Sequence, residues 1–310
     1  MSPAGAPVVV LAGGTGGAKL ARGMADVAGS DALVVIANTA DDVEIHGAHV
    51  SPDPDLVTFW LADQIDERGW GLAGDTFHVM AGLRAIGREV WFNLGDRDLA
   101  IGIERARRLA EGARLTDAIA ELGRALEAPG RVLPMCDEPV RTRVMAQGRE
   151  WPFQEFMILG RGEGPVEDVA FDGIDAARPT PEALDAIARA RAIVIGPSNP
   201  IVSIGPILAV PGMREALRSA SAPIVAVSPI VGGKVLKGPT AACLAWAGQP
   251  ATAGGVAAVY GDLLDGIVAD ERLPEDGALP LLETGLLMAD GAGRQRLARE
   301  TLAFATALAG

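Results

Sequence analysis

The sequence predicts an α/β protein with a Rossmann-like, doubly wound and mostly parallel sheet, arranged in three layers with helices on both faces. Two observations predict this fold. The apolar run Val8–Ala12 leads into a glycine-rich turn and a helical pattern, and similar runs end in polar or glycine-rich loops further along the chain. Apolar residues make up 49% of the composition and aromatic residues only 4%, which suits helices packed on a buried parallel sheet. We expect one domain over residues 1–310.

Charge and composition exclude several classes of function. The formal net charge of −13 argues against a nucleic-acid surface, which normally has a basic patch. Any phosphate ligand must therefore be held by backbone dipoles, a few placed cations or Mg²⁺. The sequence has no apolar run of about 18 residues, so we expect no membrane span. Cys136 and Cys243 are far apart, which favours reduced thiols in a cytoplasmic protein.

The turn after the first predicted strand is a candidate phosphate site. Glycines allow the backbone to turn tightly and to come within hydrogen-bond reach of an anion, and the unpaired N–H groups of the following helix point towards it. The turn matches neither the dinucleotide fingerprint nor the P-loop completely. A tight turn without a ligand is the alternative. The residues concerned are Gly13, Gly14, Thr15, Gly16, Gly17 and Lys19.

Polar residues also follow the second predicted strand, 33–37. The segment Asn38-Thr39-Ala40-Asp41-Asp42 is expected beside the glycine turn, because the carboxyl ends of neighbouring parallel strands meet at one edge. Asp41 or Asp42 could bind a ribose hydroxyl, orient a cation or cap the next helix.

A proline-rich segment carries a further pair of carboxylates. The prolines at 52 and 54 favour an extended path on which Asp53 and Asp55 converge on one side. Asp-x-Asp spacing of this kind commonly serves Mg²⁺, which takes oxygen ligands. The alternative is a loop whose aspartates start a helix at Leu56.

The middle of the chain predicts an insertion over about 99–190, lying across the ligand edge of the sheet. A third strand is expected over 89–94, ending in Asp96-Arg97-Asp98, which is either an ion-pair cluster or a ligand clamp. Helices follow over 99–126, and a β-hairpin is expected over 142–157. The α/β alternation then resumes with strands at 192–195, 223–227, 266–269 and 285–288 and a final helix over 294–308.

Five strand ends carry the polar or glycine-rich loops, and in an open parallel sheet these loops gather at one edge. The sequence has no Gly-x-Ser-x-Gly elbow and no Cys–His pairing, which disfavours acyl chemistry. A phosphate cradle facing carboxylates instead indicates phosphoryl transfer, in which positioning and charge neutralisation supply most of the catalysis.

These motifs resemble the 2-phospho-L-lactate transferase or phosphoenolpyruvate transferase family of coenzyme F(420) biosynthesis. The similarity covers nearly the whole chain, and the later blocks are more specific than the glycine turn. Three positions depart from the family pattern: Leu56 replaces Thr, Ile101-Gly102 replaces Thr-His, and Cys136 replaces Ser. The matching blocks are 13–20, 38–42, 51–53, 91–100, 131–135, 153–155, 197–200, 227–233 and 237–239.

The resemblance implies an Mg²⁺-assisted transfer of a phospho-carboxylic acid from its guanosine diphosphate conjugate to the ribityl hydroxyl of the deazaflavin Fo, with release of GMP. Asp53, Asp55 and Arg97 would be catalytic. Asp53, Asp96 and Arg97 would bind Fo, and Asp53 and Asp55 would hold the metal. We also expect a homodimer. The guanosine nucleotide would contact the glycine turn with Lys19, together with Asn38, Thr39, Ser198, Asn199, Pro200 and Ser228.

Two other functions remain open at this point. One is a non-enzymatic nucleotide-sugar-binding regulator of the gluconeogenesis-factor type, which shares the glycine-rich start. The other is a dinucleotide oxidoreductase, against which the missing third glycine argues. The sequence does not decide between phosphoenolpyruvate, phospholactate and phosphoglycerate, because such differences depend on pocket shape.

Overall fold

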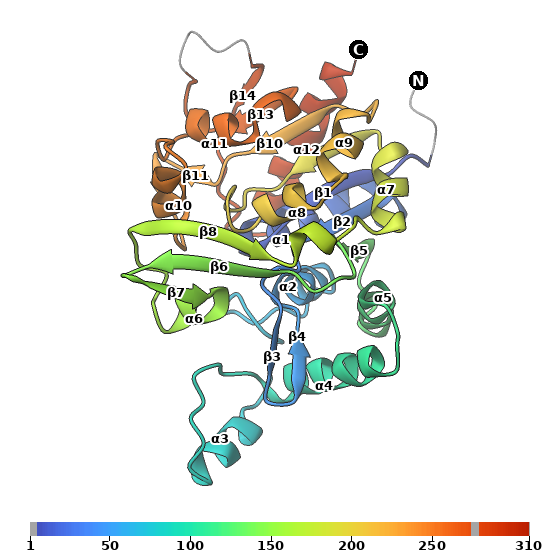
Figure 1. The fold of residues 1–310 in the computed structure, drawn as a ribbon. Coiled ribbons are helices and arrows are strands. Elements are labelled where there is room, and N and C mark those ends of the chain that lie inside the picture. Colours follow the sequence, from blue (N-terminus) through green and yellow to red (C-terminus); the bar gives the residue numbers. More distant parts are fainter. Residues whose placement is uncertain (1–4, 274–278, 310) are drawn as a thin grey trace.

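A computed structural model describes residues 5–273 and 279–309. Its centre is a seven-stranded sheet in the order β14-β13-β10-β9-β1-β2-β5, with every neighbouring pair parallel (Figure 1). From β1 the chain adds β2 and then the edge strand β5 on one side. It then crosses back, and β9 pairs with the other side of β1. This is the Rossmann order, and it confirms the predicted doubly wound sheet. The strands are β1 (Val8–Ala12), β2 (Leu33–Ala37), β5 (Arg131–Pro134), β9 (Ala192–Ile195), β10 (Ile224–Val227), β13 (Gly266–Ala269) and β14 (Leu281–Glu283).

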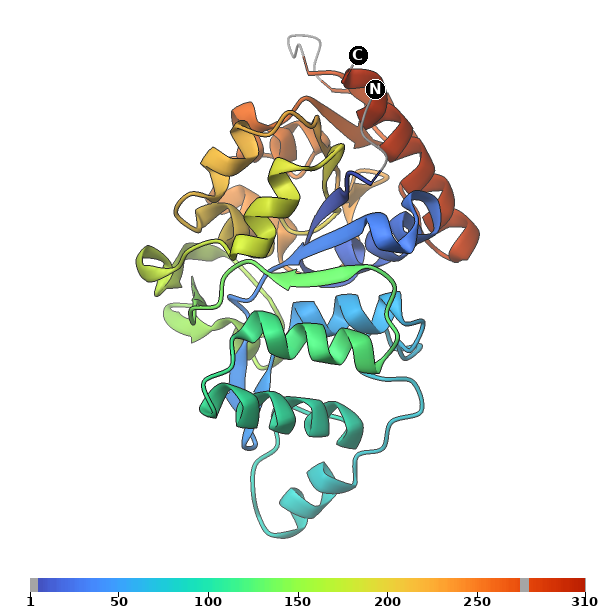
Figure 2. The ribbon, with the colours of Figure 1, turned by 90° about the vertical axis from the view of Figure 1, so that its right-hand side faces the viewer.

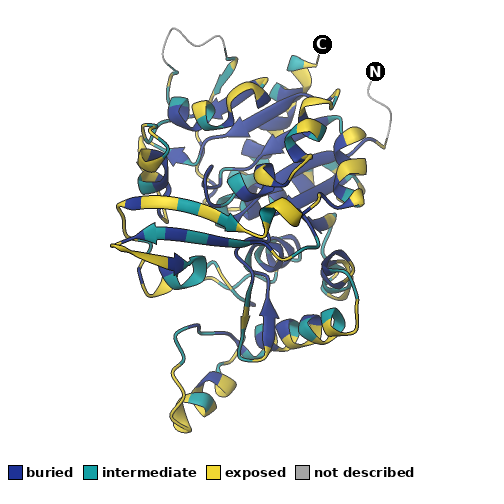
Figure 3. Cartoon of the chain, viewed as in Figure 1, coloured by how far each residue is buried: buried dark blue, intermediate teal, exposed yellow. Residues whose placement is uncertain are grey.

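Helices cover both faces of this sheet, which confirms the three layers. One apolar core includes Met24, Val57 and Leu297, and it packs α1, α2, α5 and α12 on one face. The other core, with Ile187 and Tyr260, packs α7, α8, α9 and α11 on the opposite face. The inner strands of this sheet are buried along their length (Figure 3). The helices are α1 (Gly14–Ala28), α2 (Pro52–Leu61), α5 (Leu115–Ala125), α7 (Pro181–Ala188), α8 (Gly205–Ala209), α9 (Met213–Arg218), α11 (Ala253–Tyr260) and α12 (Gly291–Leu308).

A small antiparallel sheet lies beside the main domain. The strands β6 (Arg141–Ala146), β7 (Arg149–Pro152) and β8 (Val166–Asp172) pair in the order β7-β6-β8. The predicted hairpin is confirmed, but its second arm ends at Pro152 and continues as α6 (Phe153–Ile158). The predicted insertion at 99–190 is not continuous, because β5 and α7 lie within that range and belong to the central domain.

A lobe extends from the sheet's carboxyl edge (Figure 2). It contains the hairpin β3 (Val43–Ile45) and β4 (Ala48–Val50), together with α3 (His78–Ala85) and α4 (Asp96–Ala110). The strand predicted over 89–94 is wrong. This segment has no strand pairing, because Phe92 and Leu94 instead fill a small core with Met80 from α3.

Shorter elements complete the fold. The strand predicted over 285–288 is also wrong, since the edge strand β14 ends at Glu283. The final helix is confirmed and is capped by Asp290, whose side chain accepts a hydrogen bond from Gly293 N at 2.7 Å. No helix among residues 5–273 and 279–309 is long and apolar enough to cross a membrane. The α-helix and strands not yet mentioned are β11 (Ile230–Val231), β12 (Lys234–Val235) and α10 (Thr240–Trp246).

Candidate functional site

The loops after β1 and β9 meet at the point where the strand order reverses. Gly13 N donates a hydrogen bond to Ser198 Oγ at 3.3 Å. A Cβ added at Gly16 would lie 2.1 Å from Pro197 O, and one at Gly17 would lie 2.8 Å from Ser198 Oγ. Glycine is therefore required where the two loops touch. In open α/β sheets ligands bind at such a switch point, so the structure brings the predicted 13–17 and 196–200 segments together.

The glycine turn is itself the first turn of α1. The helix begins at Gly14, whose φ of +70° favours glycine. Gly14 N donates to Asp53 Oδ1 at 2.7 Å, so a carboxylate already lies at the positive end of this helix. The next amides of the first turn have no intrahelical acceptor, and they remain suited to an anion.

Asp53 is held at this junction by the first turn of α2. It is buried, and its Oδ2 accepts from Asn38 Nδ2 at 3.1 Å. Burial, together with the nearby charge of Asp42, raises the pKa of Asp53 to about 6, against the two hydrogen bonds that lower it. The extended path predicted for 52–55 is wrong, because Pro52 starts a helix, a position that proline favours.

Asp55 therefore faces a different partner from Asp53. Arg105 from α4 forms a buried ion pair with it, in which Nη1 lies 3.0 Å from Oδ2 and Nη2 donates to Oδ1. The same Nη1 donates to His49 O at 3.0 Å. The two aspartates have different hydrogen-bond partners, although both line the aromatic cavity described below. Arg105 was not among the predicted residues, although its spacing from Leu99 and Gly102 puts it on the buried face of α4.

Close packing of α4 on β4 brings Arg105 within reach. A Cβ at Gly102 would lie 2.9 Å from Ala48 Cβ and 3.2 Å from His49 O. A histidine at this position would not fit without moving α4. Glycine in place of the family's histidine at position 102 therefore allows α4 to pack closely on β4.

Two further buried carboxylates lie between β2 and β3. Asp42 Oδ2 lies 2.9 Å from His49 Nε2, and its Oδ1 accepts from Ser51 Oγ at 2.8 Å. Asp41 Oδ1 accepts from Thr142 Oγ1 at 3.1 Å. Burial raises the pKa of both groups, and the charge of Asp53 adds to the effect on Asp41. The helix-cap alternative is wrong for both, because the strand β3 follows them.

An aromatic cavity of about 450 Å³ opens beside Asp53. Asp98 on its wall is largely buried, and burial together with the charges of Asp55 and Asp75 raises the pKa of Asp98 to about 7, against Arg105. The cavity is large enough for a small planar ligand. Its lining includes Phe59, Trp70, Trp91, Phe92, Asp53, Asp55, Asp98 and Gln154.

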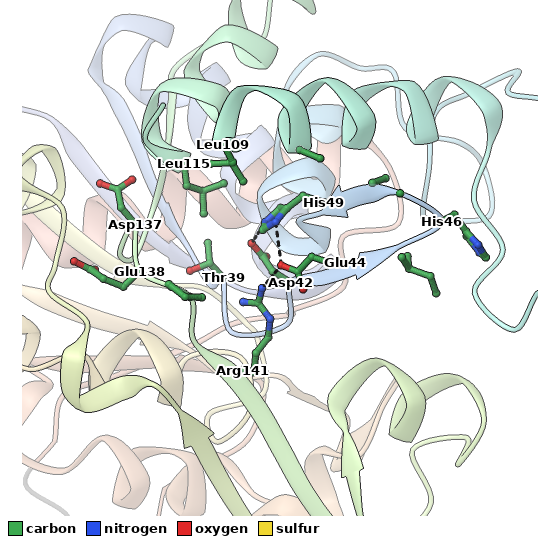
Figure 4. Close-up of a pocket in the computed structure, with 15 residues that line it drawn as sticks. Thr39, Asp42, Glu44, His46, His49, Leu109, Leu115, Asp137, Glu138 and Arg141 are labelled. Carbon is green, nitrogen blue, oxygen red and sulfur yellow. Dashed lines mark hydrogen bonds and ion pairs between the residues drawn. The ribbon is translucent and has the colours of Figure 1, made fainter. Parts of the chain in front are cut away.

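A second cavity of about 570 Å³ lies on the other side of β4 and is lined by His49 and its partners. In Figure 4, His49 faces both Asp42 and Glu44, and Glu44 in turn faces Arg141. Leu109 and Leu115 form the apolar wall above them. The predicted residue Thr39 lines this cavity as well.

Asp96 and Arg97 lie at the start of α4, in the lobe. Asp96 caps α3, because its carboxylate accepts from Thr76 Oγ1, His78 N and Val79 N at 2.6–2.9 Å. Arg97 is exposed, and its Nη1 donates to Ala73 O at 3.2 Å. Among the described residues Arg97 has no ion pair, so the ion-pair cluster considered for 96–98 is not formed.

The remaining predicted residues lie around the same edge. Asn199 Oδ1 accepts from Ile201 N at 2.9 Å, and its buried Nδ2 has no partner in the described part of the chain. Ser228 Oγ accepts from Ile230 N at 3.1 Å. Lys19 Nζ donates to Met288 O at 3.4 Å. Thr15 and Pro200 lie in the two loops that meet.

The described residues contain no group of three or more His, Cys, Asp or Glu side chains arranged to hold a metal ion. A protein site that holds Mg²⁺ with one or two carboxylates and substrate phosphates needs fewer ligands. Asp53 suits that role, because within the described part of the chain its buried charge has no cationic partner within 4 Å. Asp55 suits it less well, because both of its oxygens face the guanidinium of Arg105.

Fold and loop contacts define a Rossmann-like α/β protein whose candidate site lies at the switch point of the sheet. The model of the family 2-phospho-L-lactate transferase CofD matches residues 8–283. The chain belongs to this family, which confirms the resemblance of the motifs.

Individual proteins agree with this assignment. The chain is 40% identical over 266 residues to the 2-phospho-L-lactate transferase of Methanosarcina mazei, covering 86% of this chain and 87% of that protein. It is 41% identical over 315 residues to the phosphoenolpyruvate transferase of Kitasatospora aureofaciens, covering 96% and 97%. A solved UPF0052-family protein from Bacillus halodurans is similar in fold, with a TM-score of 0.57 at 20% identity over 87% of this chain and 82% of that one.

Proposed function

We propose that the protein transfers a phospho-carboxylic acid from its guanosine diphosphate conjugate to the ribityl hydroxyl of Fo, releasing GMP, in coenzyme F(420) biosynthesis. The acid is phosphoenolpyruvate, phospholactate or phosphoglycerate. One observation carries the proposal: Asp53 lies between the first amide of α1 and the aromatic cavity. The names of the relatives in Methanosarcina and Kitasatospora support the same type of reaction.

In this proposal the donor lies at the switch point. The first-turn amides of α1 and the 196–200 loop receive the guanosine nucleotide, with Lys19, Asn38, Thr39 and Ser228 at its edges. Asn199 adds a buried Nδ2 that has no partner among the described residues, and such a group is costly to leave unpaired.

Fo would occupy the aromatic cavity. Trp70, Trp91 and Phe59 offer apolar faces on which a planar ring can stack. Asp96 and Arg97 would contact Fo from the lobe, and Asp53 would contact its hydroxyl. Asp96 would do so while capping α3, which restricts its movement.

The reaction joins the two sites at Asp53. The hydroxyl oxygen of Fo forms a bond to the phosphorus of the phospho-acid, and the bond from that phosphorus to the bridging oxygen of GMP breaks. The hydroxyl proton passes to the Asp53 carboxylate, which acts as the general base. Arg97 would balance charge on the migrating group.

Mg²⁺ would fit beside Asp53, and when bound it would neutralise charge on the donor phosphates. The Arg105 guanidinium repels a second cation near Asp55, so we propose Asp53 as the direct ligand. Asp55 would then support the metal position from the same turn of α2.

The proposed function can be tested by incubating the protein with Fo, Mg²⁺ and one guanylylated acid at a time. The products are then identified by mass spectrometry. The expected result is one product carrying the phospho-acid on Fo, with an equal amount of GMP. Binding of guanosine nucleotide without any turnover would instead favour the alternative of a non-enzymatic nucleotide-sugar-binding regulator. Tight binding of NAD would favour an oxidoreductase.

Thermal unfolding gives a simpler test of the nucleotide site. GDP or GMP at saturating concentration should raise the Tm by several degrees, because a ligand that binds only the native state stabilises it. An unchanged Tm with guanosine nucleotide, together with a shift by NAD, would contradict the proposal.

A homodimer would fit the apolar surface of the lobe. Ile86 is 72% exposed, Ile103 48% and Val79 44%, and exposed apolar groups of this kind often mark an interface. We expect Ile86→Asp to lower the mass measured in solution from dimer to monomer.

A further inference from the structure

Two cations, Lys19 and Arg294, lie over the ring of Trp60, and a third, Lys237, is close enough for its charge to act on Lys19. Lys19 Nζ lies 5.5 Å and Arg294 Cζ lies 5.1 Å from the centre of the Trp60 ring. Lys237 belongs to the loop after β12, and its Nζ lies 4.0 Å from where a Cβ would be placed on Gly69. We call Lys19, Lys237 and Arg294 the cation cluster.

Neighbouring carboxylates do not neutralise this cluster. None of its three members has an ion pair within 4 Å among residues 5–273 and 279–309. The charge of Arg294 lowers the pKa of Asp26, but Asp26 forms its ion pair with Arg22. Burial lowers the pKa of Lys19, and the charges of Arg294 and Lys237 lower it further. The cations therefore repel one another in a chain whose net charge is −13.

The cluster lies close to the proposed donor site. Lys19 is five residues beyond Gly14 on α1, or about 7.5 Å along the helix axis. Gly69 precedes Trp70, which lines the aromatic cavity. Lys237 thus lies at a loop beside one cavity wall, whereas Arg294 packs on Gly23, further along α1 than Lys19.

We propose that Lys19, Lys237 and Arg294 form an anion-binding position that takes a phosphate or carboxylate group of the donor. This inference rests on the proposed function and adds Lys237 and Arg294 to the residues that hold the substrate. A doubly charged oxyanion would relieve the repulsion among the three cations, and charge-assisted hydrogen bonds of this type are stronger than neutral ones. Trp60 would keep Lys19 and Arg294 in place through its ring face.

Charge-removing variants with matched controls test the position. Lys237→Gln and Arg294→Gln remove one member each. Lys234→Gln changes an exposed lysine of the preceding strand β12, and Arg299→Gln changes an exposed arginine of the helix that carries Arg294. The measurements are the Kd for GDP, GMP and free phosphoenolpyruvate by calorimetry, the donor KM and kcat, and the Tm of each variant.

The expected result is a rise of about tenfold in the donor KM for each cluster variant, with kcat and Tm nearly unchanged. Both controls should stay within about twofold of wild type. The dependence of KM on salt should also weaken in the cluster variants, because screening acts on the charges that they remove.

The ligand series identifies which group is bound. A weaker Kd for GDP assigns the cluster to the phosphate chain, and an unchanged GDP affinity with a raised donor KM assigns it to the transferred acid. The anion-binding position would be overturned, and the proposed reaction left standing, if both cluster variants kept the wild-type KM and Kd. Equal losses of donor affinity in the control variants would have the same meaning. Absence of turnover in the wild type, with GDP binding still weakened by the cluster variants, would overturn the proposed reaction and leave the cluster standing.

Discussion

Two regions border Asp53, and they are built in opposite ways. The glycine side, formed by the 13–17 and 196–200 loops, consists of backbone contacts and small side chains. The charged side, formed by β4, α2 and α4, contains the buried pair of Asp55 with Arg105 and the buried Asp42 next to His49. The geometry of the glycine side is fixed by how closely the two loops can approach each other. The geometry of the charged side is fixed by ion pairs that are buried away from water.

The difference determines how each region can fail. Removing one partner of a buried ion pair leaves an uncompensated charge, which is strongly destabilising. Adding a single carbon atom to a close contact instead forces the backbone apart. The glycine side and the charged side can therefore be tested by separate substitutions, although both border Asp53.

The largest effect on stability is expected at Arg105. Arg105→Met leaves Asp55 buried and unpaired, and we expect a loss of about 3–5 kcal/mol in the free energy of unfolding. The double variant Arg105→Met/Asp55→Leu removes both charges and should recover most of that loss. Denaturant unfolding of the two variants measures the difference. Equal destabilisation of the single and double variants would show that the guanidinium acts through packing rather than charge.

The largest effect on rate is expected at Asp53. Asp53→Asn keeps the size of the side chain and an acceptor for Gly14 N but removes the charge. We expect a loss of at least about a hundredfold in kcat, or about 2.7 kcal/mol, as for a missing general base or charge stabiliser.

GDP affinity provides the control for this variant. It should be largely preserved in Asp53→Asn, because the nucleotide is held by the glycine side. Wild-type turnover at saturating Mg²⁺ would show that Asp53 is not catalytic, and Asp55 would be the next candidate.

The same comparison explains what the sequence could predict. Strand, glycine turn and helix are neighbours in the chain, so β1, the turn and α1 were predicted correctly, as were β2, β9, β10 and β13. The contact between Asp55 and Arg105 spans 50 positions and depends on the close approach of α4 to β4 at Gly102. No local pattern contains that information.

Errors in the sequence interpretation have the same origin. The segment 89–94 is apolar and has strand composition, but its side chains fill the small core of the lobe instead of joining the sheet. The two prolines near Asp53 suggested an extended chain, yet Pro52 at the first position of a helix is equally compatible with its fixed φ. Tertiary packing decides between such alternatives.

An intermediate effect is expected on the glycine side. A Cβ at Gly16 would lie 2.1 Å from a backbone oxygen, so Gly16→Ala must push the two loops apart. We expect a loss of about 1–3 kcal/mol in unfolding free energy, together with weaker GDP binding. Gly82→Ala in α3 is the control, because a Cβ there meets nothing within 4 Å and alanine favours a helix. A Gly16→Ala protein with normal stability and GDP affinity would show that the loops separate easily.

The smallest effect on stability is expected at Arg97, at the outer edge of the charged side. Its guanidinium is exposed and, among the residues that the structure describes, bonds only a backbone oxygen. Arg97→Lys should therefore change the unfolding free energy by less than about 0.5 kcal/mol. If Arg97 contacts Fo or the migrating group, the planar fork of its guanidinium cannot be replaced by the single ammonium of lysine, and we expect about a tenfold loss in kcat/KM. Arg88→Lys, at another exposed arginine of the lobe, should leave both quantities unchanged. Near-normal turnover of Arg97→Lys would remove this arginine from the site, and the charged side would then act on the substrate only through Asp53 and its buried partners.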